Sequence, residues 1–138
     1  MNWKRFLLAF LAILFLSGCQ SNTTTDKGHA DTIKLTRNFY NYLHAQDYET
    51  VIVNYSCIGE EQPNFQIGPN EKTIMQSAFP WLNQQLTQVT ELDYSDSIAH
   101  MQLSLNDGTN TTQEEITLKN YNNIWCVDIL PTITPFLK

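Results

Sequence analysis

The chain of 138 residues is long enough for one domain with one hydrophobic core. It carries 14 acidic residues against eight basic ones, a formal net charge of −6, and the charges form no long run of one sign. This balance argues against nucleic acid and anionic lipid surfaces as partners, because both are recognised by basic patches.

Residues 1–18 have the composition of a secretory signal peptide. Lys4 and Arg5 form a positive start, and an unbroken apolar run follows from Phe6 to Leu16. As a helix, a run of about 11 residues measures roughly 16 Å, which is short of the ~30 Å of hydrocarbon that a transmembrane helix crosses. The pattern therefore predicts an export signal and not a membrane-spanning anchor.

This segment ends in Leu16-Ser17-Gly18-Cys19, which resembles the lipobox of bacterial lipoproteins. In that family the cysteine thiol receives a diacylglyceryl group, a peptidase cleaves before the cysteine, and the new amino terminus is commonly acylated. The resemblance implies that Cys19 is the lipidated first residue of a mature chain and that the lipid bilayer is a partner. Two or three acyl chains anchor a protein stably, whereas one binds only marginally. The alternative is an ordinary secreted protein with a coincidental cysteine.

The mature chain is expected to begin with a lipidated tether at residues 19–29, because Ser21 to His29 is polar and lacks apolar periodicity. Without residues 1–18, the net charge is about −8. In Gram-negative envelopes an Asp after the lipidated Cys commonly marks inner-membrane retention, and this chain has Gln20 instead. The resemblance therefore implies the bacterial cell envelope, and the outer membrane if the source has one.

Residues 30–138 are predicted to form one domain that begins with helices. Apolar side chains in residues 30–45 recur at helical spacing, and Asp31 is the expected N-cap. A second helix is expected after the cap Asp47. The β-branched run at 51–53 leaves a strand as the alternative there.

A loop is predicted for residues 58–70, which hold two glycines and two prolines. Residues 71–88 then follow a helical pattern, with Asn70 as the expected cap. Pro80 removes a backbone hydrogen bond and clashes with the preceding turn. This helix is therefore expected to kink or restart near Phe79.

After Gln88 the apolar period changes to two, which predicts strands. The expected strands are 89–94, 98–105, 114–119 and 124–130. Turn residues separate the later strands, at Asn106-Asp107-Gly108 and at Tyr121-Asn122-Asn123. Pro131 and Pro135 are expected to end the regular pairing.

Helices followed by an antiparallel meander indicate an α+β domain in which the helices cover one face of a curved sheet. This order resembles the nuclear transport factor 2-like superfamily, which has a cone-shaped, cystatin-like fold, and within it the bacterial lipoprotein domains. The resemblance is carried by FYNYLHAQDYETV (39–51), SIAHMQLSLNDGTNTTQEEITLKN (97–120) and NNIWCVDIL (122–130). Because this fold hosts enzymes, binding modules and assembly domains, the resemblance does not choose among these functions.

Cys57 and Cys126 remain as an even pair once Cys19 is lipidated, in a compartment where disulfides form. A bridge would close a loop of roughly 70 residues, which the chain-entropy model values at about 4 kcal/mol. The resembled fold implies that the second helix ends near the last strand. Cys126 is then expected to face the helices and Trp125 to turn away, covered by residues 133–137 or partly exposed. Two unpaired buried thiols are the alternative.

The three histidines, His29, His44 and His100, lie far apart and in no recognised catalytic motif, so exposed or simply hydrogen-bonded side chains are expected. No His or second Cys stands at ligand spacing, and the sequence predicts neither a metal site nor a cofactor. The adjacent carboxylates Glu60-Glu61 and Glu114-Glu115 are expected to be solvated, because neighbours on a strand point apart.

The leading hypothesis is a non-enzymatic envelope lipoprotein that binds another envelope protein or a small apolar ligand. The alternative is an isomerase- or dehydratase-like enzyme, since some relatives in the resembled superfamily use Tyr, Asp or His inside the cone. Tyr40 on the first helix and His100 on the sheet are the residues expected to meet there in that case. An apolar, filled cone favours the binding role, and two converging titratable groups favour the enzyme.

We expect the substitution Cys19→Ser to abolish acylation, because serine lacks the thiol that receives the diacylglyceryl group. In a detergent phase partition, the variant should move from the detergent phase to the aqueous phase. Mass spectrometry of the amino-terminal peptide reports the lipid directly. A variant that stays in the membrane with no lipid on residue 19 would contradict the lipobox interpretation.

Overall fold

The computed structural model describes residues 23–137. The predicted signal peptide, Cys19 and Gln20 lie outside the described residues. Within residues 23–137, none of the helices has the length and apolar character needed to cross a membrane.

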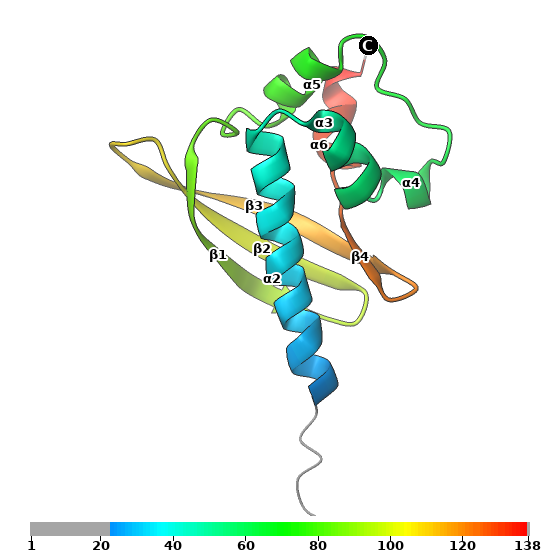
Figure 1. The fold of residues 1–138 in the computed structure, drawn as a ribbon, viewed down its shortest axis with the longest axis vertical. Helices are drawn as coiled ribbons and strands as arrows, with labels where there is room; N and C mark the ends of the chain where they lie inside the picture. Colours follow the sequence, from blue (N-terminus) through cyan, green and yellow to red (C-terminus); the bar gives the residue numbers. More distant parts are fainter. Residues whose placement is uncertain (1–22, 138) are drawn as a thin grey trace, which may run out of the picture.

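The domain is a four-stranded antiparallel sheet with one long helix, α2, crossing one face (Figure 1). The strands are β1 (Gln85–Tyr94), β2 (Ile98–Asn106), β3 (Thr111–Tyr121) and β4 (Ile124–Val127), and they pair in chain order. The helices precede the sheet, apart from a short helix after β4. The predicted α+β class is therefore confirmed.

Helix α2 spans Thr23–His44 and begins seven residues before the predicted start at Ala30. Residues 23–29, expected in the tether, thus belong to the first helix, and Asp31 lies inside it instead of capping it. Polar contacts explain the difference. The buried Thr32 hydroxyl donates to Glu91 of β1 at 2.9 Å, and His29 pairs with the same carboxylate. Apolar periodicity does not report such contacts.

Four short helical segments follow α2. They are α3 (Tyr48–Thr50), the π-helical segment η1 (Val51–Tyr55), α4 (Ile58–Glu61) and α5 (Glu71–Ala78). Asp47 caps α3 as predicted, by accepting a hydrogen bond from the Thr50 N–H at 3.2 Å. The alternative of a strand at 51–53 is wrong, and part of the predicted loop 58–70 is helical.

Helix α5 ends at Ala78 and does not restart, so the prediction of a helix to residue 88 is wrong. A proline disfavours the helical conformation in the residue before it, which is Phe79 here. The helix therefore ends before Pro80. Asn70 occupies the N-cap position, but its side chain makes no capping hydrogen bond. The chain then turns, and β1 begins at Gln85.

The last strand pair is closed by a two-residue turn. Asn122 and Asn123 have φ values of +53° and +68°, a conformation that asparagine tolerates better than most residues. Strand β4 ends at Val127, three residues before the predicted end, because the chain leaves the sheet to form α6 (Leu130–Ile133). A 3₁₀ segment, η2 (Thr134–Phe136), completes the described chain.

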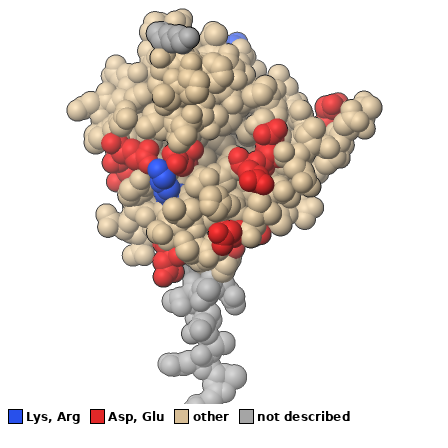
Figure 2. Space-filling model, turned by 180° about the vertical axis from the view of Figure 1, so that it is seen from behind, with Lys and Arg blue, Asp and Glu red and all other residues tan. Residues whose placement is uncertain are grey.

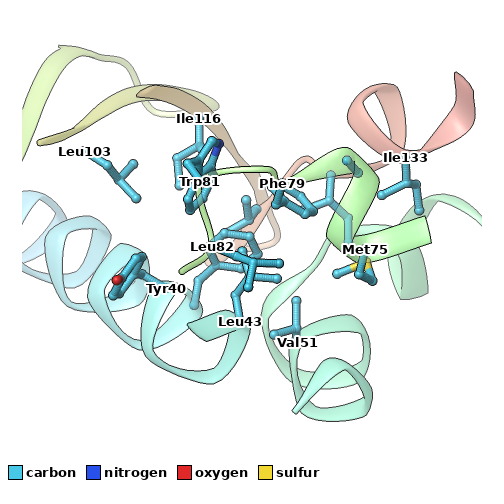
Figure 3. Close-up of a cluster of buried hydrophobic side chains, with 14 of the residues drawn as sticks. Tyr40, Leu43, Val51, Met75, Phe79, Trp81, Leu82, Leu103, Ile116 and Ile133 are labelled. Atoms are coloured by element: carbon cyan, nitrogen blue, oxygen red, sulfur yellow. The ribbon is translucent and has the colours of Figure 1, made fainter. Parts of the chain in front are cut away.

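The core fills the space between α2 and the sheet. Phe39 and Leu43 of α2 and Met101, Leu103 and Leu118 of the sheet are all fully buried. At one end of this core, side chains from α5 and α6 converge with those of the turn before β1 (Figure 3). The interior of the domain is therefore apolar and packed.

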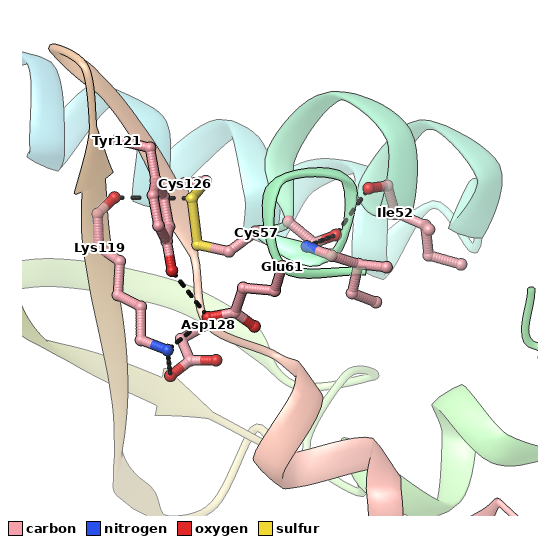
Figure 4. Close-up of a disulfide and its surroundings, with 9 residues drawn as sticks. Ile52, Cys57, Glu61, Lys119, Tyr121, Cys126 and Asp128 are labelled. Atoms are coloured by element: carbon pink, nitrogen blue, oxygen red, sulfur yellow. Dashed lines mark hydrogen bonds and ion pairs between the residues drawn. A yellow bond between two sulfur atoms is a disulfide. The ribbon is translucent and has the colours of Figure 1, made fainter. Parts of the chain in front are cut away.

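The predicted bridge between Cys57 and Cys126 is present, with a Cα–Cα distance of 5.0 Å (Figure 4). It forms at the edge of the sheet and not between the helical layer and the sheet face. Ser56 makes a parallel bridge with Val127, and the Cys57 N–H donates to the Val127 carbonyl at 2.9 Å. Residues 56 and 57 thus lie beside β4 like a very short fifth strand.

The predicted orientation of Cys126 and Trp125 is wrong. Cys126 pairs with Lys119, which places it on the sheet face away from α2. The half-buried Trp125 is on the α2 side, with its ring centroid 5.5 Å from that of Tyr94. The expectation assumed that the bridge runs from a helix down to the sheet, whereas Cys57 approaches β4 from the side.

We expect the double substitution of Cys57 and Cys126 to alanine to lower the melting temperature by more than about 10 °C, because the bridge closes a loop of sequence separation 69. Reducing agent should lower the melting temperature of the unmodified chain and leave that of the double variant unchanged. Thermal melting followed by circular dichroism makes both measurements. Equal melting of the oxidised and reduced chain would contradict a stabilising role for the bridge.

Candidate functional site

The first half of β3 has no neighbouring strand on its outer side. Strand β4 pairs only with residues 118–121 of β3. Beside the unpaired part lies a groove of about 400 Å³, between β3, the end of β4, α6 and the turn after α5. We call the unpaired part, residues 111–117, the β3 edge.

Backbone groups of the β3 edge point into the open space. The Asn120 N–H donates to the Ser97 carbonyl at 2.9 Å, on the β2 side, and the Asp128 N–H donates to the Thr117 carbonyl at 2.8 Å, on the β4 side. Because successive residues of a strand alternate, Gln113 and Glu115 direct their N–H and C=O groups away from β2. Within residues 23–137, the N–H groups of these two residues have no hydrogen-bond partner.

The floor of the groove is apolar. Phe79 and Trp81, in the turn after α5, pack edge to face with ring centroids 5.5 Å apart, and Figure 3 shows Ile116 beside Trp81. Val127 and Ile129 line the side where β4 ends. These side chains are almost fully buried in the core, so they give the groove a preformed and rigid floor.

The rim of the groove is acidic. Glu114, Glu115 and Asp128 are among its lining residues, and no Lys or Arg of the described chain lines it. On the face of the molecule seen from behind, acidic side chains clearly outnumber basic ones (Figure 2). The Oδ1 atom of Asp128 is buried and has no hydrogen-bond partner within residues 23–137. The negative charge of the rim therefore comes mainly from Glu114 and Glu115.

Asp128 is held in place by Lys119, which also binds Glu61 (Figure 4). The Lys119 Nζ lies 2.9 Å from Asp128 Oδ2, and the Tyr121 hydroxyl donates to Glu61 at 2.9 Å. The hydrogen bond from Lys119 lowers the pKa of Glu61, and the hydrogen bonds to Glu61 and Asp128 raise the pKa of Lys119. Glu61 was expected to be solvated, but it joins α4 to the sheet beside the disulfide.

Tyr40 and His100 do not meet, so this part of the enzyme hypothesis is wrong. The buried Tyr40 hydroxyl donates to the Gln84 carbonyl and accepts the Leu86 N–H at 3.1 Å, which holds the start of β1 against α2. Burial raises its pKa. His100 is exposed on the opposite face of the sheet, 3.3 Å from the Thr117 hydroxyl.

The other two histidines make structural contacts. His44 lies 2.6 Å from the Leu82 carbonyl, and its ring stacks on Tyr40 with centroids 5.5 Å apart. His29 pairs with Glu91 of β1. In the part of the chain that the structure describes, no three His, Cys, Asp or Glu side chains come together to hold a metal ion.

Sequence reasoning missed the groove, because it depends on where β4 ends. Two features of the sequence could have indicated it. Pro131 follows β4 closely, and the polar residues from Thr111 onward lengthen β3 beyond the predicted strand. No family model, curated protein or solved structure matches the chain. The function of the groove therefore has to be inferred from its geometry.

We expect Lys119→Gln to destabilise the domain by about 1–2 kcal/mol at pH 7, because it leaves two half-buried carboxylates without their cation. The pKa of Glu61 is lowered in the folded state, so its contribution is complete above its ordinary pKa and is lost as the pH falls through the folded value. The loss caused by Lys119→Gln should therefore be smaller at pH 3 than at pH 7, as measured by urea unfolding.

The matched control is Lys72→Gln, which makes the same charge change at an exposed position. We expect it to change the unfolding free energy by less than about 0.5 kcal/mol at either pH. Equal effects of the two substitutions would show that the Lys119 cluster does not stabilise the end of the groove.

Proposed function

We propose that the protein is a lipid-anchored bacterial envelope protein whose domain binds an extended segment of another envelope protein along the β3 edge. The observation that carries this proposal is the row of outward N–H and C=O groups at Gln113 and Glu115, next to an apolar groove. An added strand satisfies such groups, and pockets beside the edge then select its side chains.

The groove also indicates the chemistry of the partner segment. Side chains of an added strand alternate between the two faces of the sheet. Those on the α2 side meet the apolar floor at Phe79 and Trp81, and those on the other side lie near Glu115 and Asp128. We therefore expect a segment that alternates apolar with basic or hydrogen-bond-donating residues.

A second copy of this chain fits the β3 edge poorly. Pairing two such edges would bring Glu114 and Glu115 of both copies close together, and like charges on paired strands are destabilising. The other edge of the sheet is irregular, because β1 has register shifts at 86–88 and 91–93. Such bulges discourage pairing, whereas the register of β2 with β3 is regular up to Thr111.

The packed interior supports a binding role over an enzyme in the cone. Met101, Leu103 and Leu118 fill the space under α2, which also leaves little room for a small apolar ligand. The nuclear transport factor 2-like assignment remains part of the proposal, supported by the order of a long helix, short helices and an antiparallel sheet. Lipidation of Cys19 and an outer-membrane location are likewise proposed from the lipobox and Gln20.

The test compares two substitutions at one position in the intact lipoprotein. Glu115→Pro removes an outward N–H without touching the ladder to β2, and Glu115→Ala keeps this N–H. In affinity capture from membranes, we expect the proline variant to lose at least about 90% of a partner that the alanine variant retains. Such a loss corresponds to roughly 1.4 kcal/mol or more.

Gln113→Pro provides an independent proline at the next outward position of the same edge. Thermal melting of each variant shows whether the domain remains folded. A folded pair of proline variants that keep the partner would contradict strand addition at this edge. Failure to recover any partner with the unmodified protein would count against the interaction itself.

A further inference from the structure

A second cleft, of about 590 Å³, lies at the end of the domain where α2 begins. It is bounded by the first turns of α2, by the β1–β2 turn and by the β3–β4 turn. Its lining includes Asp31, Tyr94, Asp96, Asn120, Asn123 and Trp125. We call it the polar-aromatic cleft. It shares no lining residue with the groove at the β3 edge.

Three rings form a row, and two of them, Tyr94 and Trp125, line this cleft. The ring centroid of Tyr94 lies 4.0 Å from that of His29 and 5.5 Å from that of Trp125. Gly28 permits this arrangement, because a Cβ atom at that position would collide with the Tyr94 hydroxyl. Both Tyr94 and Trp125 remain half-buried, although aromatic side chains gain most from complete burial.

Carboxylates surround the aromatic row. Burial raises the pKa of Tyr94, and the negative charges of Asp96, Glu91 and Asp31 raise it further, so all three carboxylates act on the same hydroxyl. Glu91 is already bound to His29 and Thr32. Asp31 and Asp96 are among the residues that line the cleft, so the described lining favours a cationic ligand.

The lining also contains a buried acceptor without a donor. Asn120 donates from Nδ2 to the Asp96 carbonyl at 2.9 Å, which ties the β1–β2 turn to β3. Its Oδ1 atom is buried and has no hydrogen-bond partner in the described chain. The Nδ2 hydrogen bond fixes the backbone position of Asp96 in the lining of the cleft.

We propose that the polar-aromatic cleft binds the ammonium group of a primary amine. Asp31 and Asp96 balance its charge and accept its N–H groups, and the rings of Tyr94 and Trp125 contact it through cation–π interactions. A metal ion lacks ligands, because the described residues contain no group of three suitable side chains. A quaternary ammonium has no N–H to donate.

The ammonium group has two possible sources, a free small amine or the head group of a phospholipid. Gly28 is nine residues after Cys19, a span of roughly 14 Å as helix and about 30 Å if extended. If Cys19 is lipidated, the cleft lies within reach of the bilayer surface. Ammonium binding itself does not depend on lipidation or on the β3 edge.

Titration of the full-length protein in a maltoside detergent tests the proposal by saturation-transfer NMR. The probes are ethanolamine, its quaternary analogue choline and its uncharged analogue ethylene glycol. We expect saturable binding of ethanolamine, weaker binding of choline and no saturable binding of ethylene glycol. Ethylene glycol binding as tightly as ethanolamine, or no saturable binding of ethanolamine, would overturn the proposal.

Substitutions locate the site. Asp96→Asn and Trp125→Leu should each weaken ethanolamine binding about two- to fivefold, whereas Asp107→Asn at the distant β2–β3 turn should leave it unchanged. Equal loss for Asp96→Asn and Asp107→Asn would overturn the site assignment. Glycerophosphoethanolamine separates the sources: tighter binding than ethanolamine supports a lipid head group, and weaker binding supports a free amine.

Discussion

The attachment of residues 56 and 57 to β4 divides this edge of the sheet into a covered part and an open part. The disulfide and the hydrogen bond from Cys57 to Val127 fix the chain before α4 against the outer side of the last strand. These contacts cover the outer edge of β4. After Val127 the chain leaves the sheet for α6, so the preceding part of β3 has no neighbouring strand on this side. The covered and open parts of the same edge therefore meet at Val127.

Charge is distributed unevenly around this boundary. On the covered side, Lys119 binds both Glu61 and Asp128, so two carboxylates of an acidic protein are balanced by one cation. On the open side, Glu114 and Glu115 face the groove without a described cation in its lining. The same acidic surface is thus neutralised by Lys119 at one point and has no described cation a few residues away.

The sequence predicted the elements whose signal is local. The alternation of β2, the cap at Asp47 and the even cysteine pair all report short-range or compositional constraints, and the structure agrees with them. The start of α2 was missed, because Thr32 and His29 are fixed by Glu91 about 60 residues away. The orientation of Cys126 was missed for the same kind of reason, since it depends on the side from which Cys57 arrives.

The candidate sites were harder to predict than the fold, because both lie between elements distant in sequence. The groove joins the turn after α5 to β3 and the end of β4, and the polar-aromatic cleft joins α2 to two turns of the sheet. Helices α5 and α6, which adjoin the groove, lie near one end of α2, and the β1–β2 and β3–β4 turns, which adjoin the cleft, lie toward the other end (Figure 1). A helix from Gly28 to His44 spans roughly 25 Å. The groove and the polar-aromatic cleft share no lining residue. If both proposed ligands bind, an extended segment in the groove would therefore not block an ammonium group in the cleft.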